Sequence, residues 1–180
     1  MHYEQIINFW FNEIKPKQWY VKDPEFDLLI KDRFSQCHEQ ASRCELANWR
    51  QWPLGRLAEV IVLDQLSRNL YRDDYRAFAC DALALALAQE AISANVQDSF
   101  TNTSQKSFLY MPFMHSESKA IHETAVQLFS EPGLESNLEF ELKHKAIIDR
   151  FGRYPHRNII LGRESTEEEE AFLKQPGSSF

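Results

Sequence analysis

The stretch PLGRLAEVIVLDQL, which covers residues Pro53–Leu66, decides the fold of this 180-residue chain. Proline suits the first position of a helix, where the N–H that it lacks would have no partner. The residues behind it are apolar on nearly all sides of a helix, with few polar interruptions. A helix of that kind is normally surrounded by other helices. The stretch therefore predicts an array of helices with Pro53–Leu66 in its interior.

Two further segments have the pattern of packed helices. The first starts at Asp23–Pro24, where the carboxylate can cap free N–H groups. Its apolar residues recur at the spacing of one helix face: Phe26, Ile30, Phe34, Cys37 and Ala41. The second, Ala77–Ile92, alternates alanine with leucine, and its length and alanine content favour a helix over a buried strand. Both segments extend the predicted array.

The remaining predicted helices are shorter, and a polar link is expected at residues 95–106. Helical spacing predicts further helices around residues 6–14, 121–128 and 138–151. A last short helix is predicted to start at the cap Ser165–Thr166. The chain has only five glycines and shows no hairpin signal. We therefore predict an all-α fold, built as one helical domain over residues 1–180.

Charge and composition argue against several classes of function. The net charge is −7, which disfavours a nucleic-acid surface built on bulk positive charge. The longest apolar tract, Ala82–Ala88, has seven residues, far short of the ~20 that a membrane helix needs. The N-terminus lacks the features of a signal peptide, and the three cysteines lack the spacing of a metal knuckle. We expect a cytoplasmic protein with reduced thiols that binds neither nucleic acid nor membrane.

The first polar cluster lies in the motif LDQLSRNLYR, at the end of the interior helix. Five side chains are predicted to project from one face of that helix: Asp64, Gln65, Arg68, Asn69 and Arg72. The apolar stripe of the helix runs into this face, so we expect the cluster to be partly buried. An internal Asp64–Arg68 ion pair explains part of it. Arg72 has only Asp73 and Asp74 as acids close to it in sequence.

The second cluster lies in the motif MPFMHSES. His115 stands just ahead of a predicted helix start, where Ser116 can cap and Glu117 is favoured by the helix dipole. His122 follows seven residues later on nearly the same face, which makes a two-histidine metal site conceivable. No third residue has the spacing of a known metal motif, so we predict no metal.

The third cluster is the turn GRYPHRN after the helix that Gly152 is expected to terminate. It contributes Arg153, His156, Arg157 and Asn158, and the helix before it carries His144 in an apolar row. Arginine forks bind carboxylate or phosphate at two points, and histidine can donate or accept a proton near neutral pH. The alternative is a network of ion pairs between helices, which we favour for two other arginines, Arg150 and Arg163.

Three blocks of this sequence resemble the bacterial domain of unknown function family 924. The blocks are LAEVIVLDQLSRNLYR, YMPFMHSES and DRFGRYPHRNIILGRESTEEEEAFL, in that order along essentially the whole chain. The resemblance implies a tetratricopeptide-like α-α superhelix and implies no activity. The family pattern has Phe and Pro where this chain has Leu66 and Ser67, and a glycine is usual near Cys44; these departures lie outside the polar face.

Together, the clusters predict a site that binds a small anionic ligand bearing phosphate or carboxylate. Its predicted ligand-binding residues are Asp64, Gln65, Arg68, Asn69, Arg72, His115, Glu117, His144, Arg153, His156, Arg157 and Asn158. His115 and His156 are the candidates for proton transfer, and no cofactor is predicted. Two alternatives stay open. One is a module that binds an acidic peptide through basic clamps and exposed aromatics, and the other is a metal-dependent hydrolase. The sequence does not predict the oligomeric state.

Overall fold

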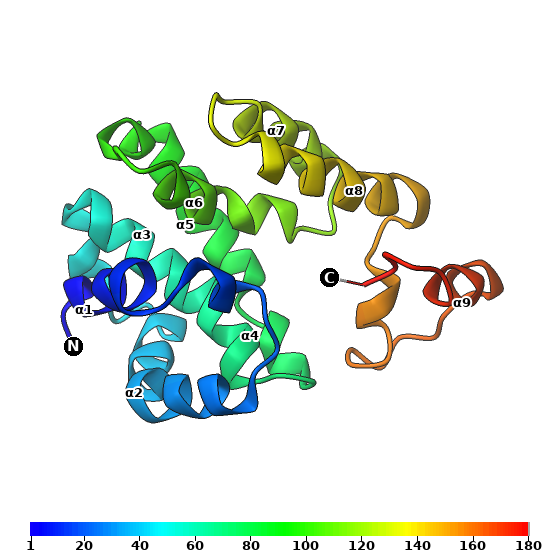
Figure 1. Cartoon of the computed structure of the whole chain (residues 1–180), viewed down its shortest axis with the longest axis horizontal. Coiled ribbons are helices and arrows are strands. Elements are labelled where there is room, and N and C mark those ends of the chain that lie inside the picture. The colour runs from blue at the N-terminus through cyan, green and yellow to red at the C-terminus, as the bar shows by residue number, and fades with distance from the viewer. Residues whose placement is uncertain (180) are drawn as a thin grey trace. The chain divides into compact units, whose positions relative to one another are not determined.

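Every regular element that the structure describes is a helix. The structure is a computed structural model that describes residues 1–179, and Phe180 lies outside that range (Figure 1). No strand occurs within those 179 residues, which confirms the predicted all-α fold. The superhelical arrangement that the resemblance implies stays a prediction. No helix in the described range is long and apolar enough to cross a membrane.

The chain forms two compact units. Unit 1 comprises Met1–Arg72 and Arg76–Pro112, and unit 2 comprises Asp73–Tyr75 and the residues from Phe113 onward. The helices of unit 1 are α1 (Tyr3–Asn8), α2 (Pro24–Ser42), α3 (Pro53–Ile61), α4 (Ser67–Leu70), α5 (Asp81–Ser93) and most of α6 (Thr103–Met114). Those of unit 2 are α7 (Lys119–Phe129), α8 (Glu135–Phe151) and α9 (Glu167–Leu173).

The interior helix of unit 1 is α3, as the sequence predicts. Its residues Leu57, Ala58, Val60 and Ile61 are fully buried. The helix continues through a π-helical segment, Val62–Leu66, into α4. Gly55 is needed near its start, because a Cβ there would overlap the backbone carbonyl of Trp49.

The α2 helix also follows its sequence pattern. The Asp23 carboxylate accepts the N–H groups of Glu25 and Phe26 at 2.9 and 3.3 Å, so the predicted cap is present. All five residues of the predicted stripe, Phe26 to Ala41, are buried. In α5 the buried face consists of alanines, Ala84, Ala88 and Ala91, which allows its neighbours to approach closely. That helix begins at Asp81 and not at Ala77, because residues 75–78 form a separate 3₁₀ turn.

The tryptophans of unit 1 belong mostly to its core. Trp10 and Trp49 are buried, and Trp19 packs edge-on against Phe108 with 4.9 Å between ring centroids. Trp52 is the exception, with 56% of its surface exposed. The predicted polar link at 95–106 is wrong in its last four residues, since α6 already begins at Thr103. The Asn102 side chain accepts the N–H of Ser104 at 2.9 Å, so what read as a polar link is helix-capping chemistry.

Unit 2 is built on the α7–α8 hairpin, drawn in yellow shades in Figure 1. The α8 helix ends at Gly152, whose φ of +69° is the left-handed conformation expected of a terminating glycine. It begins at Glu135, three residues before the predicted start. The predicted cap at Ser116 is wrong, because α7 begins at Lys119 and the residue before it is Ser118. The predicted Thr166 cap is confirmed, and its hydroxyl accepts the N–H of Glu169.

Candidate functional site

The first predicted cluster belongs to unit 1, and its members face two different helices. Arg68 makes a two-point contact with Asp81 of α5, at 3.0 and 3.1 Å, and lies 3.3 Å from Asp64. Gln65 donates to the other oxygen of Asp64 at 2.6 Å. Asp64 is fully buried, so burial of the cluster and its Asp64–Arg68 ion pair are both confirmed. Because the pairing of Arg68 runs to α5, this part of the cluster links α4 to α5.

The other two members of that cluster bind α2. Arg72 donates from Nε and Nη2 to the two oxygens of Asp27 at 2.5 and 2.7 Å, and Asn69 donates to Asp27 at 2.8 Å. Burial raises the pKa of Asp27, but these hydrogen bonds outweigh it and hold the pKa below its usual value. The prediction of one common face is therefore wrong, since the π-helical segment and the end of α4 at Leu70 redirect the side chains.

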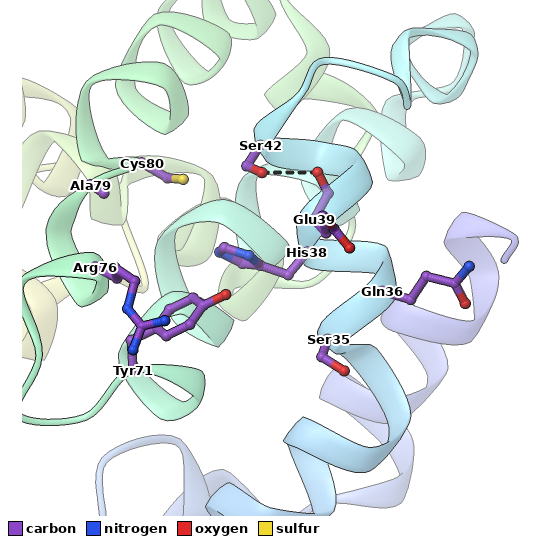
Figure 2. A pocket seen from close by; sticks show the side chains of 9 residues that line it. All are labelled: Ser35, Gln36, His38, Glu39, Ser42, Tyr71, Arg76, Ala79 and Cys80. Carbon is purple, nitrogen blue, oxygen red and sulfur yellow. Dashed lines mark hydrogen bonds between the residues drawn. The ribbon is translucent and has the colours of Figure 1, made fainter.

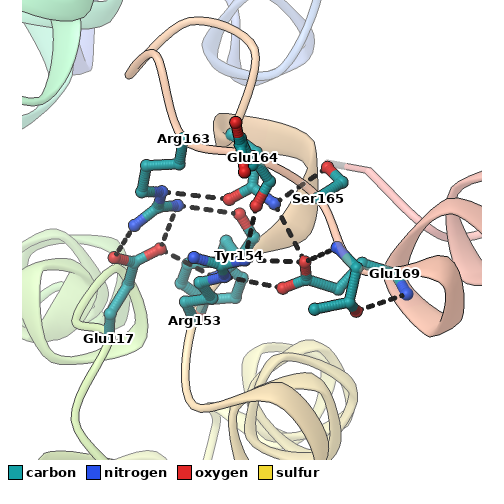
Figure 3. Close-up of polar contacts among 9 residues, drawn as sticks. Glu117, Arg153, Tyr154, Arg163, Glu164, Ser165 and Glu169 are labelled. Carbon is teal, nitrogen blue, oxygen red and sulfur yellow. Dashed lines mark hydrogen bonds and ion pairs between the residues drawn. The ribbon is translucent and has the colours of Figure 1, made fainter.

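The second and third predicted clusters come together inside unit 2, at Tyr154. This tyrosine is 1% exposed. Its backbone N–H donates to Glu117 at 2.7 Å, and its hydroxyl donates to the carbonyl of Met114 at 2.5 Å. Both partners, Met114 and Glu117, lie in the MPFMHSES motif. Tyr154 therefore joins the turn after α8 to the turn before α7. Figure 3 shows Tyr154 beside the Glu117–Arg163 salt bridge, with its N–H bound to Glu117 and its carbonyl bound by Arg163.

Four positively charged or titratable side chains surround the Tyr154 ring. Arg157 lies over it, with its guanidinium carbon 4.6 Å from the ring centroid, and also donates to the carbonyl of His115 at 3.1 Å. The imidazoles of His156, His144 and His122 have centroids 5.6, 5.7 and 6.3 Å from that of Tyr154. We call Tyr154, His115, His144, His156 and Arg157 the Tyr154 cluster.

Two salt bridges hold the turn that carries this cluster. Arg153 donates from Nε and Nη2 to Glu169 at 2.6 and 2.7 Å, and Arg163 donates to Glu117 at 2.6 and 2.9 Å. Asn158 links them, since its Nδ2 donates to Glu169 at 3.3 Å and its Oδ1 accepts from Arg163 at 3.0 Å. Figure 3 shows the resulting chain of contacts from Glu117 to Glu169. The ion-pair alternative thus describes Arg153 as well as Arg163.

These contacts shift the pKa values of both carboxylates. The Arg153 guanidinium, helped by the N–H of Thr166, lowers the pKa of Glu169 to about 2. Burial raises the pKa of Glu117, but the hydrogen bonds from Arg163 and from the Tyr154 N–H outweigh it and leave that pKa lowered. Arg150, in contrast, pairs with Glu168 at the surface, where both side chains are about half exposed.

A buried pair, His122 and Glu141, joins α7 to α8 beneath the cluster. Both side chains are fully buried, and Nδ1 of His122 lies 2.6 Å from Oε1 of Glu141. His122 Nε2 lies 2.9 Å from the carbonyl of Ser116, so it carries a hydrogen and one further proton is shared with Glu141. Burial raises the pKa of Glu141. Oε2 of Glu141 has no hydrogen-bond partner in the described part of the chain.

His144 is an uncharged member of the cluster. Its Nδ1 donates to the carbonyl of Phe140 at 2.8 Å, which leaves Nε2 without a hydrogen. Burial lowers its pKa to about 3, and the nearby positive groups of His115, His122 and Arg157 act in the same direction. His144 is therefore a neutral imidazole in the buried part of unit 2.

Several residues of this site were not predicted. Tyr154, Glu141 and Arg163 were absent from the predicted site, and His122 was considered only as a metal ligand. The spacing of Glu141, three residues before His144, places both on one face of α8 and could have indicated that Glu141 is buried. Among residues 1–179, no group of three or more His, Cys, Asp or Glu side chains could hold a metal ion.

Comparisons with known proteins show the family and the fold of this chain. A family model described as "Bacterial protein of unknown function (DUF924)" matches residues 6–177. A solved structure, that of the protein of unknown function ATU0120 from Agrobacterium tumefaciens, is 37% identical in sequence. It superposes with a TM-score of 0.90 over 96% of each chain. No curated protein matches the sequence.

Proposed function

Because the chain belongs to the DUF924 family of bacterial proteins, whose function is unknown, we propose a function from its own residues: the Tyr154 cluster binds a small anionic ligand. The ligand bears a phosphate or a carboxylate group. Arg157 provides the fixed positive charge, and His115 and His156 orient the anion or exchange a proton with it. We expect the protein in the cytoplasm, so phosphorylated metabolites and small carboxylates are the compounds to test.

The observation that carries this proposal is the position of Arg157. Its guanidinium is always charged and only 7% of the residue is exposed, which strengthens its attraction for an anion compared with a surface arginine. The lowered pKa of His144, caused first by burial and then by the nearby positive groups, is consistent with a positive potential at this place.

The remaining predicted arginine of the turn has a supporting role. Arg153 is bound at two points by Glu169, so it holds the turn from the side opposite Glu117. The same salt bridges leave the turn with little freedom to move, so the residues between them are preorganised for a ligand. His115 and His156 are only partly buried, which gives a ligand a way to reach them.

A thermal-shift screen tests the proposal. Phosphorylated metabolites and small carboxylates are added to the wild-type protein, and hits are titrated by calorimetry. A ligand at 100 times its Kd stabilises by about 2.7 kcal/mol, which corresponds to a rise in Tm of roughly 5–10 °C for a chain of this length. We expect Arg157→Lys and His156→Gln to reduce the rise. Arg150→Gln, which alters an exposed arginine of the same unit, is the matched control.

The proposal fails if no compound raises the Tm. It also fails if a hit stabilises the Arg157→Lys and Arg150→Gln variants equally. Folding of each variant is checked by its own unfolding curve without ligand, so that a lost response is not confused with a lost fold.

A peptide-binding function is the second candidate, and the exposed Trp52 of unit 1 is the observation in its favour. The other three tryptophans are buried or half-buried in unit 1, which gives this alternative less support. Fluorescence of a labelled acidic peptide distinguishes the two. Saturable binding that is lost in Trp52→Ala, but kept in Arg157→Lys, favours the peptide.

A further inference from the structure

Unit 1 contains a pocket of about 470 Å³, whereas the Tyr154 cluster belongs to unit 2. The pocket lies between α2 and the segment of residues 71–80, and Figure 2 shows the side chains that line it. His38 and Glu39 come from α2, and Tyr71 and Cys80 come from the other segment. A volume of this size is within the range of small-molecule sites.

His38 offers a hydrogen-bond acceptor to this pocket. Its Nε2 lies 2.7 Å from the hydroxyl of Ser67, and that hydroxyl donates to the carbonyl of Leu63 at 2.5 Å. Since Ser67 has one proton to give, His38 Nε2 is the donor of the first bond and Nδ1 carries no hydrogen. Burial lowers the pKa of His38, which keeps the ring neutral.

This acceptor nitrogen is open to a ligand. Among residues 1–179, Nδ1 of His38 makes no hydrogen bond, yet it is not one of the buried polar atoms that lack a partner. It is therefore reached by solvent, and since His38 lines the pocket, the pocket is the route.

The hydroxyl of Tyr71 is a second polar group that is open to a ligand. Within the described part of the chain it makes no hydrogen bond, and it is not a buried polar atom, so solvent reaches it too. The rings of His38 and Tyr71 meet edge-on with 5.3 Å between their centroids, and Figure 2 shows the hydroxyl end of Tyr71 directed toward α2, beside the His38 ring. A phenol hydroxyl can donate a hydrogen bond. The pocket therefore presents an acceptor next to a donor.

The remaining walls hold these two groups in place and add little charge. The guanidinium carbon of Arg76 lies 4.6 Å from the centroid of the Tyr71 ring and supports that ring. Glu39 is paired with Arg43 at 2.6 Å. The pKa of the Cys80 thiol is raised, chiefly by burial, so this side chain is an uncharged wall. Since both open polar atoms belong to uncharged groups, the pocket suits a neutral ligand.

We propose that this pocket binds a small neutral cyclic amide, a planar ring in which an N–H stands next to a carbonyl. The N–H donates to Nδ1 of His38, the carbonyl accepts the hydroxyl of Tyr71, and the ring lies toward Cys80. An open-chain amide is trans, so its N–H and carbonyl point in opposite directions. A ring holds the amide cis and directs both groups to the same side, which matches the neighbouring acceptor and donor of the pocket. Pyridones and pyrimidinones have this pattern.

Titration of the full chain with 2-pyridone, followed by NMR, tests the proposal. We expect saturable shifts of the His38, Tyr71 and Cys80 signals with a Kd of about 1 mM or tighter. N-Methyl-2-pyridone keeps the carbonyl but has no N–H, so it leaves Nδ1 of His38 without a donor and is expected to bind about tenfold more weakly. This comparison leaves the protein unaltered, so a folding defect cannot cause the difference.

Two variants test the contact with the carbonyl. Tyr71→Phe removes the hydroxyl but keeps the ring, and it is expected to weaken 2-pyridone binding about fivefold. Tyr20→Phe, which alters an exposed tyrosine of unit 1 outside the pocket, is expected to leave binding unchanged. Thermal unfolding without ligand checks that each variant is folded. Equal binding to both variants, equal binding of 2-pyridone and its N-methyl derivative, or no saturable shift of the three pocket residues would overturn the proposal.

A chemical readout gives an independent check. In a Cys44→Ser background, which removes the exposed thiol, alkylation by iodoacetamide at alkaline pH reports access to the pocket, and mass spectrometry separates Cys80 from the buried Cys37. We expect 2-pyridone at ten times its Kd to slow the alkylation of Cys80 about tenfold, and N-methyl-2-pyridone at the same concentration to slow it about twofold. Alkylation rates that do not respond to 2-pyridone would contradict the assigned position.

Discussion

Arg153 and Glu169 form a two-point salt bridge in which the carboxylate side chain is 3% exposed and the arginine 29% exposed. The bridge ties the turn after α8 to the first turn of α9 across 16 residues of sequence. Because Glu169 also accepts N–H groups from Thr166 and Asn158, it is the carboxylate on which this part of unit 2 depends.

Glu169→Gln is expected to destabilise the protein by about 3 kcal/mol, because it leaves a partly buried guanidinium without its counter-charge. Urea unfolding measures the change. Glu168→Gln is the matched control, since its exposed pairing with Arg150 is worth less than about 1 kcal/mol. Similar losses in the two variants would contradict a special role for Glu169.

Acid is expected to weaken unit 2 through the same group. The pKa of Glu169 is lowered to about 2 in the folded protein, whereas an unfolded glutamate titrates near 4.3. The stabilisation is therefore complete above about pH 4.5 and is lost as the pH falls toward 2. Urea unfolding at several pH values should show a shallower acid loss in Glu169→Gln than in the wild type. Parallel curves would exclude this residue as the cause.

Tyr154→Phe is expected to cost about 1–2 kcal/mol, because the carbonyl of Met114 loses a buried donor while the packing of the ring is kept. Thermal unfolding measures the loss. The exposed Tyr75→Phe should stay within about 0.5 kcal/mol of wild type. An unchanged Tm for Tyr154→Phe would show that water replaces the hydroxyl at no cost.

Asp27 and Arg72 are expected to be energetically coupled. A double-mutant cycle with Asp27→Asn and Arg72→Gln should give a coupling energy of about 1–2 kcal/mol, because two hydrogen bonds join the partly buried side chains. The exposed pair Glu39 and Arg43, four residues apart at the C-terminal end of α2, supplies the comparison at about 0.3–0.5 kcal/mol. Additive effects of the first pair would mean that its contacts are replaced by solvent.

His144 is expected to stay neutral across the physiological range. Its pKa is lowered to about 3 in the folded protein, whereas the unfolded value is near 6.5. Stability therefore falls as the pH drops below about 6.5, because the unfolded chain binds the proton first. Imidazole ¹⁵N shifts measured from pH 8 to pH 4 should show no titration of His144 in the native protein. The same measurement in urea should restore it, and a native titration near pH 6 would contradict its burial.

The helices were largely predictable because their signals are local. The caps at Asp23 and Thr166 and the terminating Gly152 each act within a few residues, and they occur where the sequence indicates. The stripe on α2 is periodic and could be counted. The misplaced cap at Ser116 shows the limit of such signals. That serine has the right chemistry, but its carbonyl is bound by His122 and the helix begins three residues later.

The candidate site was predictable in composition but not in pairing. His115, Glu117, His144, Arg153, His156, Arg157 and Asn158 are brought together within unit 2. Whether the Asp64–Arg72 cluster of unit 1 completes the same site stays a prediction. Tyr154, around which the cluster forms, was missed because nothing in a short turn indicates which of its side chains becomes buried.

The sequence by itself determined the helical fold, because helix periodicity and capping depend on residues one to four positions apart. Only the tertiary structure decided which carboxylate each arginine binds. Arg72 finds Asp27 from 45 residues away, and Arg163 finds Glu117 from 46. A guanidinium binds any carboxylate with nearly the same geometry, so sequence chemistry leaves the choice open. The packing of helices selects one partner by bringing it within reach and removing water.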